Sequence, residues 1–155
     1  MKIISFDQAT HITGYAIYDD GELAGFGIIR SKATDPHVRM REMFEQISAL
    51  IDQETPDYVS IEGTQCQNGN YKAFSTLCQM QGVLFAILFI RHIEFFVVPP
   101  MTWKAFHKIG NGKRALQKRA AIQIVHNKGI DASEDECEAI LQGEYVLDLI
   151  RKEQK

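Results

Sequence analysis

The sequence predicts an α/β fold in which a five-stranded mixed sheet carries helices on both faces. Three β-rich segments follow one another near the start of the chain, and the turn Asp20-Gly21 joins the second to the third, as in an antiparallel hairpin. Two further strand-like segments alternate with long helical ones, which is the order that produces parallel strands. We therefore expect three antiparallel strands followed by two parallel ones.

The individual elements follow from the spacing of apolar residues. Apolar residues in short β-rich runs indicate strands, and apolar residues three or four apart indicate helices. The expected strands are Lys2–Gln8, Thr13–Asp19, Glu22–Arg30, Asp57–Glu62 and Phe95–Val98. The expected helices are Pro36–Glu54, Tyr71–Arg91, Met101–Lys108, Lys113–Asn127 and Ser133–Arg151. Pro56 ends the first helix, because the residue before a proline is pushed out of the α region. Ser133 and Glu136 form a capping box for the last helix.

Length and composition indicate one soluble domain spanning residues 1–155. The three cysteines form no CxxC pair and no signal peptide precedes them, which predicts a cytoplasmic protein with reduced thiols. The helix at Tyr71–Arg91 is apolar nearly all round at its end, so we expect it in the centre of the core. Its most apolar run, Val83–Ile90, is far shorter than the roughly 20 residues of a membrane span. We therefore expect no membrane association.

The charges are distributed in blocks. Between Met101 and Lys128 there are seven Lys or Arg residues and no Asp or Glu, whereas Gly129–Lys155 carries eight acidic and three basic residues. A basic segment beside an acidic one suits a protein that holds both phosphates and a cation. Chance clustering on a solvated helical face explains the charges alone about equally well.

Two carboxylates stand at the ends of apolar strands. Asp7 follows Ile3, Ile4 and Phe6, and Glu62 follows Val59 and Ile61. An ionised carboxylate in such a place is costly unless a cation or hydrogen bonds compensate it, and two on neighbouring strands repel each other. A shared divalent cation removes both costs. For either residue alone, a loop cap or a pairing with Lys explains the pattern at least as well.

A third segment supplies two more acids. Asp135 and Glu138 are three residues apart at the start of the last helix, so they point the same way, next to the apolar residues Ala139–Leu141. Acids at a helix start also suit the helix dipole, which accounts for Glu134 and Glu136. Four carboxylates form an all-oxygen site, which suits Mg²⁺ or Mn²⁺ and not zinc. Two such ions about 4 Å apart can hydrolyse a phosphodiester.

Four motifs in the same order resemble those of the RuvC family of Holliday-junction resolvases. They are the Asp7 strand with Thr13-Gly14-Tyr15, the segment Pro56–Glu62 (PDYVSIE), the helical Gln79–Gly82 (QMQG) and the segment Asp135–Ala139 (DECEA). The resemblance covers nearly the whole chain and is greatest to versions encoded by bacteriophages of Gram-positive bacteria. It implies an RNase H-like fold, a homodimer, Mg²⁺ or Mn²⁺ as cofactor, with two ions per site, and paired nicks across four-way DNA junctions. Forks and flaps are further expected substrates. For a phage-encoded enzyme, the compartment would be the host cytoplasm.

The resemblance also implies residue roles. Asp7, Glu62, Asp135 and Glu138 match the catalytic, metal-binding carboxylates, and Lys104 matches a basic residue near the cleaved phosphate. Either Lys113 or Lys118 matches the second basic residue. The expected DNA-binding residues are Lys104, Lys113, Arg114, Lys118, Gln65 and Tyr71.

The chain departs from the family pattern at three places. Gln8-Ala9 replaces Pro-Gly after the first Asp, and Glu138 stands where Asp is usual. After Glu62, where relatives carry an aromatic that wedges into the junction, this chain has a polar loop from Gly63 to Asn70 that contains Gln65. We therefore expect recognition of branch shape more than of base sequence. Trp103 is expected to be buried.

Two other interpretations stay open from the sequence. One is a different RNase H-like nuclease that acts on RNA. The other is a catalytically silent protein that binds junctions without cutting them. The basic segment and the four carboxylates favour a DNA endonuclease over both.

Overall fold

The computed structural model describes residues 1–66 and 69–153. Its sheet has the strand order β3-β2-β1-β4-β5, formed by β1 (Lys2–Asp7), β2 (Ile12–Asp19), β3 (Glu22–Arg30), β4 (Tyr58–Glu62) and β5 (Glu94–Val98). β1, β2 and β3 pair antiparallel, whereas β1 pairs parallel with β4 and β4 with β5. The expected mixed sheet is confirmed.

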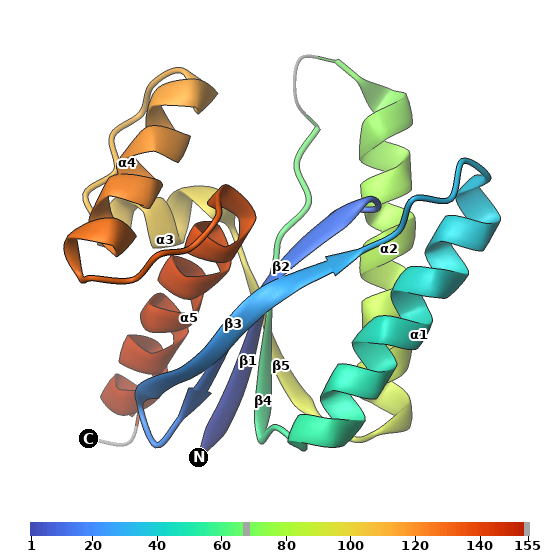
Figure 1. The fold of residues 1–155 in the computed structure, drawn as a ribbon, viewed down its shortest axis with the longest axis horizontal. Coiled ribbons are helices and arrows are strands. Elements are labelled where there is room, and N and C mark those ends of the chain that lie inside the picture. The colour runs from blue at the N-terminus through green and yellow to red at the C-terminus, as the bar shows by residue number, and fades with distance from the viewer. Residues whose placement is uncertain (67–68, 154–155) are drawn as a thin grey trace.

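Helices cover both faces of the sheet, as expected (Figure 1). One face packs against α1 (Pro36–Glu54) and α2 (Tyr71–Ile90), and the other against α3 (Pro100–Phe106), α4 (Arg114–Asn127) and α5 (Glu134–Glu153). Successive residues of β1 point to opposite faces. Ile3 accordingly lies in the core under α5, and Ile4 in the core under α1 and α2.

The helix ends agree with their sequence signals. The Asp35 side chain accepts hydrogen bonds from the backbone N–H groups of His37 and Val38 at the start of α1. At the start of α5, the Ser133 N–H donates to the Glu136 carboxylate at 2.6 Å, which is one half of the expected capping box. The Ser133–Glu136 bond fixes where α5 begins and hence where its first carboxylates lie.

The helix α2 differs from the expectation. It is long and apolar enough to cross a membrane by length and composition, but only 22% of its most apolar 18-residue window is buried. Met80, Leu84, Ile87 and Leu88 pack into the core, while Phe89 and Ile90 are exposed. The prediction of a fully central helix was therefore wrong, because an apolar composition does not show which face is covered.

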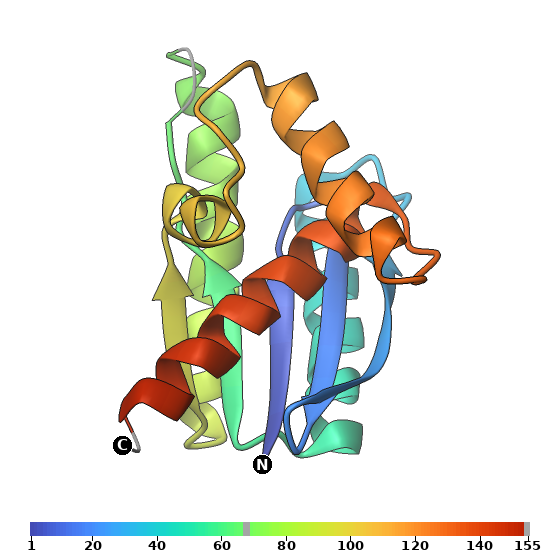
Figure 2. The same ribbon diagram turned by 90° about the vertical axis from the view of Figure 1, so that its left-hand side faces the viewer.

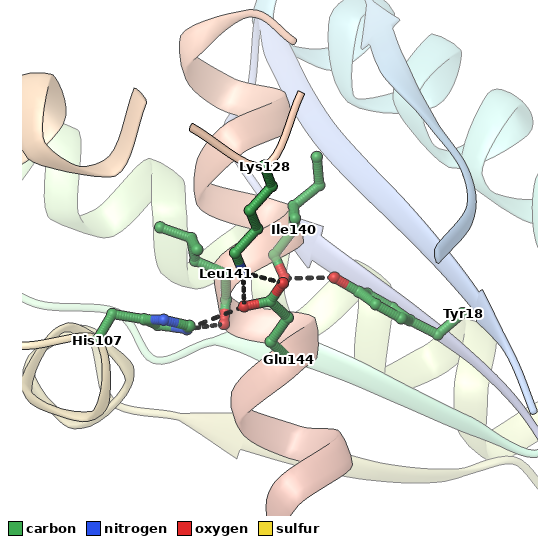
Figure 3. Close-up of polar contacts among 6 residues, drawn as sticks. All are labelled: Tyr18, His107, Lys128, Ile140, Leu141 and Glu144. Carbon is green, nitrogen blue, oxygen red and sulfur yellow. Dashed lines mark hydrogen bonds and ion pairs between the residues drawn. The ribbon is translucent and has the colours of Figure 1, made fainter. Parts of the chain in front are cut away.

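The three helices of the α5 face are joined by a polar network (Figure 3). His107, at the C-terminal end of α3, hydrogen-bonds the Leu141 carbonyl of α5 at 2.8 Å. Glu144 of α5 forms an ion pair with Lys128, at the C-terminal end of α4. On the sheet side, the Tyr18 hydroxyl donates to the Ile140 carbonyl at 2.8 Å. The network holds α3 and α4, which carry the basic segment, against α5.

Candidate active site

The four predicted carboxylates line one pocket. Asp7 ends β1 and Glu62 ends β4, directly after the paired residues Phe6 and Ile61. Asp135 and Glu138 come from the first turns of α5, which crosses the sheet (Figure 2). Together they surround a cavity of about 370 Å³. Segments far apart in the sequence thus bring four acidic groups to one end of the parallel strands.

Two close contacts set the position of α5 above the strands. The Gln142 side chain, one helical turn after Glu138, is 1% exposed. Its Nε2 lies 2.8 Å from Ser60 Oγ of β4 and 3.2 Å from both Ser5 Oγ and the Phe6 carbonyl of β1. On β2, a Cβ at Gly14 would overlap the backbone carbonyl of Asp135. The missing side chain at Gly14 therefore allows the start of α5 to reach the strand ends.

Burial and mutual repulsion dominate the electrostatics of the pocket. The pKa of Asp7 is raised well above its usual value by burial, and then by the charges of Glu62, Glu138 and Asp135. Burial raises the pKa of Glu62 to about 7, although a hydrogen bond from Trp103 and the charges of Lys104 and Arg114 oppose the rise. Burial also raises the pKa of Asp135. The site therefore resists holding all of its negative charges without a counter-ion.

The donor set fits a hard divalent cation. All four side chains supply carboxylate oxygens, the ligands that Mg²⁺ and Mn²⁺ prefer. Within residues 1–66 and 69–153, no three His, Cys, Asp or Glu side chains are already arranged around a metal position. The neighbouring Glu138 carboxyl group also raises the pKa of Asp7, by its charge and by side-chain hydrogen bonding. A bound cation would relieve this repulsion.

Glu62 is held from three directions. Trp103 Nε1 of α3 donates to its carboxylate Oε1 at 3.1 Å. The side chain of Gln8 donates to its carbonyl and accepts from its N–H, the latter at 2.8 Å. Gln81 Nε2 of α2 donates to the same carbonyl at 3.2 Å. Hydrogen bonds thus hold both the backbone of Glu62 and its carboxylate group.

Most of the predicted basic residues lie beside the acids. Arg114 and Lys118 of α4 line the carboxylate pocket. Lys104 of α3 lines an adjoining cavity that also contains Asp7, Glu62 and Glu138. Lys118 already forms an ion pair with Glu134. Lys113 is exposed at the N-cap of α4 and lines neither cavity, so the geometry favours Lys118 as the second basic residue.

The loop after Glu62 contributes polar atoms to the rim. Gln65 is exposed and lines both cavities, whereas Tyr71 is 75% exposed and lines neither. Phe74 lines the carboxylate pocket. The part of the predicted loop at residues 67–68 lies outside the described residues.

Three supporting residues were not identified from the sequence. Trp103 is buried as expected, but its bond to Glu62 could not be read from its neighbours. Gln8 appeared only as a departure from a turn motif. Gln142 did leave a signal in the sequence. It is a glutamine within an apolar helical stripe, and it lies four residues after Glu138, on the same side of the helix. The strands of Asp7 and Glu62 each carry a serine two residues earlier, on the same face as the acid, which offers it a polar partner.

Comparison with known sequences identifies relatives of the chain. The family model described as crossover junction endodeoxyribonuclease RuvC matches residues 3–132, a segment that ends just before Asp135. The crossover junction endodeoxyribonuclease RuvC of Dictyoglomus turgidum is 30% identical over 148 residues, covering 90% of this chain and 92% of the relative. That of Geotalea uraniireducens is 27% identical and covers 90% of this chain and 84% of the relative.

Solved structures share the fold at low sequence identity. The Thermus thermophilus RuvC structure has a TM-score of 0.73 at 13% identity, covering 98% of this chain and 97% of the other. The Fowlpox virus resolvase, solved with Holliday-junction DNA, has a TM-score of 0.68 at 14% identity, covering 97% and 99%. The fold is the RNase H-like one of these resolvases. The chain therefore belongs to the RuvC family, and its activity is that of a crossover junction endodeoxyribonuclease.

Proposed function

We propose that the chain cuts four-way DNA junctions by paired nicks, using two Mg²⁺ or Mn²⁺ ions held by Asp7, Glu62, Asp135 and Glu138. The observation that supports this most strongly is the convergence of these four carboxylates on one pocket, with pKa values of three of them raised. When bound, the ions would activate a water molecule and stabilise the leaving oxygen of the phosphodiester.

The chain's own residues position the substrate. Lys104 and Arg114 lie on the side of the pocket where their charges already act on Glu62. A phosphate entering the pocket between these cations and the carboxylates would gain charge stabilisation as the transition state forms. Glu62, fixed by Trp103, keeps its place while the phosphate binds.

The substrate is proposed to be branched DNA and to include forks and flaps. Stacking of a base on an aromatic ring is worth about 1–3 kcal/mol, and the described loop residues at the rim offer Gln65 in its place. Recognition would then depend on the phosphates and the shape of the branch. We expect forks and flaps to be cut within about tenfold of the four-way rate, since a glutamine cannot supply that stacking energy. The proposed compartment is the cytoplasm, or the host cytoplasm if the enzyme is phage-encoded.

A homodimer is proposed because two symmetrical nicks require two sites related by a two-fold axis. The apolar face of α2 that contains Phe74, Leu77, Met80, Gln81 and Leu84 is a natural candidate for the dimer contact from the sequence. The structure excludes it, because Met80 and Leu84 lie in the chain's own core and Gln81 binds Glu62. The exposed stripe of α2 comprises Ser75, Gln79, Gly82, Ala86 and Phe89.

Small residues on this stripe would allow a second α2 to approach closely. A Cβ at Gly82 would meet nothing within 4 Å. Covering the stripe would also remove Phe89, which is 63% exposed, from water. Light scattering should give twice 17.6 kDa for the wild type and 17.6 kDa for Ala86→Glu. A monomeric wild type that still cuts both strands would refute the dimer.

The alternatives are an RNA nuclease and a silent junction-binding protein. The experiment is a cleavage assay with a labelled four-way DNA junction, its RNA counterpart and linear duplex DNA, each with Mg²⁺, Mn²⁺ or EDTA. Asp7→Asn, Glu62→Gln, Asp135→Asn and Glu138→Gln should each abolish nicking and leave junction binding intact or tighter. A variant that keeps near wild-type cleavage would show that its residue is not a ligand. Preferential cutting of RNA, or binding without cutting, would favour the alternatives.

A further inference from the structure

The side chain of Gln8 hydrogen-bonds to β4 just beyond the point where the backbone pairing of β1 with β4 ends. The parallel register between β1 and β4 runs from Ile3 opposite Tyr58 to Phe6 opposite Ile61 and goes no further. Immediately beyond it, the Gln8 amide donates to the Glu62 carbonyl and accepts from the Glu62 N–H. One side-chain amide thus satisfies both backbone groups of Glu62, which would otherwise bond to the backbone of the neighbouring strand.

This pair of bonds is shielded from water. Gln8 is 6% exposed. Buried hydrogen bonds compete little with water, and breaking one leaves a polar group without a partner. Of the two backbone groups of Glu62, the carbonyl has a second donor in Gln81, whereas the only partner shown for the N–H within the described residues is Gln8. Gln8 therefore has a role that Gln81 does not duplicate.

The position of Gln8 in the chain couples the two strand-borne carboxylates. Its backbone directly follows Asp7, and its side chain binds the backbone of Glu62. Asp7 and Glu62 repel each other when both are ionised. This repulsion favours separation of the ends of β1 and β4. The hydrogen bonds between Gln8 and the backbone of Glu62 oppose that separation.

We propose that Gln8 is a positioning residue that fixes the spacing of Asp7 and Glu62 for the divalent cations and hence for cleavage. The inference rests on the proposed function, because it requires these two carboxylates to be metal ligands. Loss of a group that orients metal ligands typically lowers metal affinity or activity 10- to 100-fold. A residue that only stabilised the fold would change the melting temperature and leave metal affinity unchanged at temperatures below it.

The test uses Gln8→Met, which keeps the length of the side chain and removes both hydrogen bonds. Calorimetry without DNA should show the Mn²⁺ dissociation constant rising about tenfold or more. Junction cleavage should show kcat falling about 10- to 100-fold with KM within about twofold of wild type. Gln46→Ala, which removes the exposed hydrogen bonds from an α1 glutamine to the backbone carbonyls of Arg30 and Glu42, should change neither value.

A milder variant keeps the proposal testable if Gln8→Met does not fold. Gln8→Asn keeps the amide but is one methylene too short to make both bonds, and it should give an intermediate Mn²⁺ affinity. Mn²⁺ affinity and kcat within twofold of wild type in whichever variant folds would overturn the positioning role. If Asp7→Asn instead bound Mn²⁺ as tightly as the wild type, the proposed metal site would be refuted. The failure of the positioning role and the failure of the metal site are therefore distinguishable.

Discussion

Replacing Glu62 by glutamine should stabilise the metal-free protein while destroying its activity. Burial raises the pKa of Glu62 from 4.5 to about 7. Each pH unit between the folded and unfolded pKa values corresponds to about 1.4 kcal/mol. Below about pH 4.5, Glu62 is protonated in both states and costs nothing. As the pH rises towards 7, the unfolded chain ionises first, so the folded state loses up to about 3 kcal/mol of stability.

Glutamine removes this cost without removing the contact, because its Oε1 can still accept from Trp103 Nε1. In EDTA at about pH 8, urea unfolding should show Glu62→Gln more stable than wild type by up to about 3 kcal/mol, and the difference should vanish near pH 4.5. Mg²⁺ at a hundredfold excess over its dissociation constant should raise the unfolding free energy of the wild type by about 2.7 kcal/mol. It should stabilise the variant far less. Glu45→Gln, at an exposed position on α1, is the matched control.

A Glu62→Gln variant no more stable than wild type at pH 8 in EDTA would show that Glu62 carries no such desolvation cost. A stability gain of the same size at pH 4.5 would show the same, because a neutral Glu62 has no such cost for glutamine to remove.

Three further perturbations probe the supports of the site. Gly14→Ala should cost about 1–3 kcal/mol of stability and lower cleavage, since its Cβ would overlap Asp135, and wild-type values for both would contradict the close approach. Lys104→Ala should lower the salt slope of junction binding by about one and lower the rate at saturating DNA, whereas Lys152→Ala, at the other end of α5, should change neither. Burial lowers the pKa of His107 below 6.5, so the folded state should lose stability as the pH falls below about 6.5. His107→Gln should reduce that loss in urea unfolding, and an unchanged pH dependence would count against it.

The sequence predicted the five strands and their relative directions because strand alternation and helix spacing are local properties. Asp20-Gly21 marks the hairpin, and the alternation of strands with helices later in the chain marks the parallel pairs. The same alternation placed Asp7 and Glu62 on corresponding faces of two strands, and helical spacing aligned Asp135 with Glu138. Their meeting in one pocket followed from these local patterns together with the resemblance to a known family.

The supports of the site were harder to predict because they depend on contacts between distant segments. Nothing near Trp103 in the sequence shows that its indole N–H reaches Glu62, 41 residues earlier. The covered face of α2 was predicted wrongly for a related reason. Its apolar residues occur nearly all round, so composition did not distinguish the side of Met80 and Leu84 from the side of Ala86 and Phe89.

The junction of the first strand with the last helix has a consequence for how the enzyme is made. Gln142 and Ser5, which contact each other beneath the carboxylates, are 137 residues apart in the sequence. Contacts of such separation form late, because the entropy of closing the loop must first be overcome. During synthesis, the sheet and the α1–α2 layer can pack while α5 is still being made. Until α5 docks, the chain has only two of its four carboxylates in place. We therefore expect a chain whose α5 has not docked to show no cleavage in the junction assay.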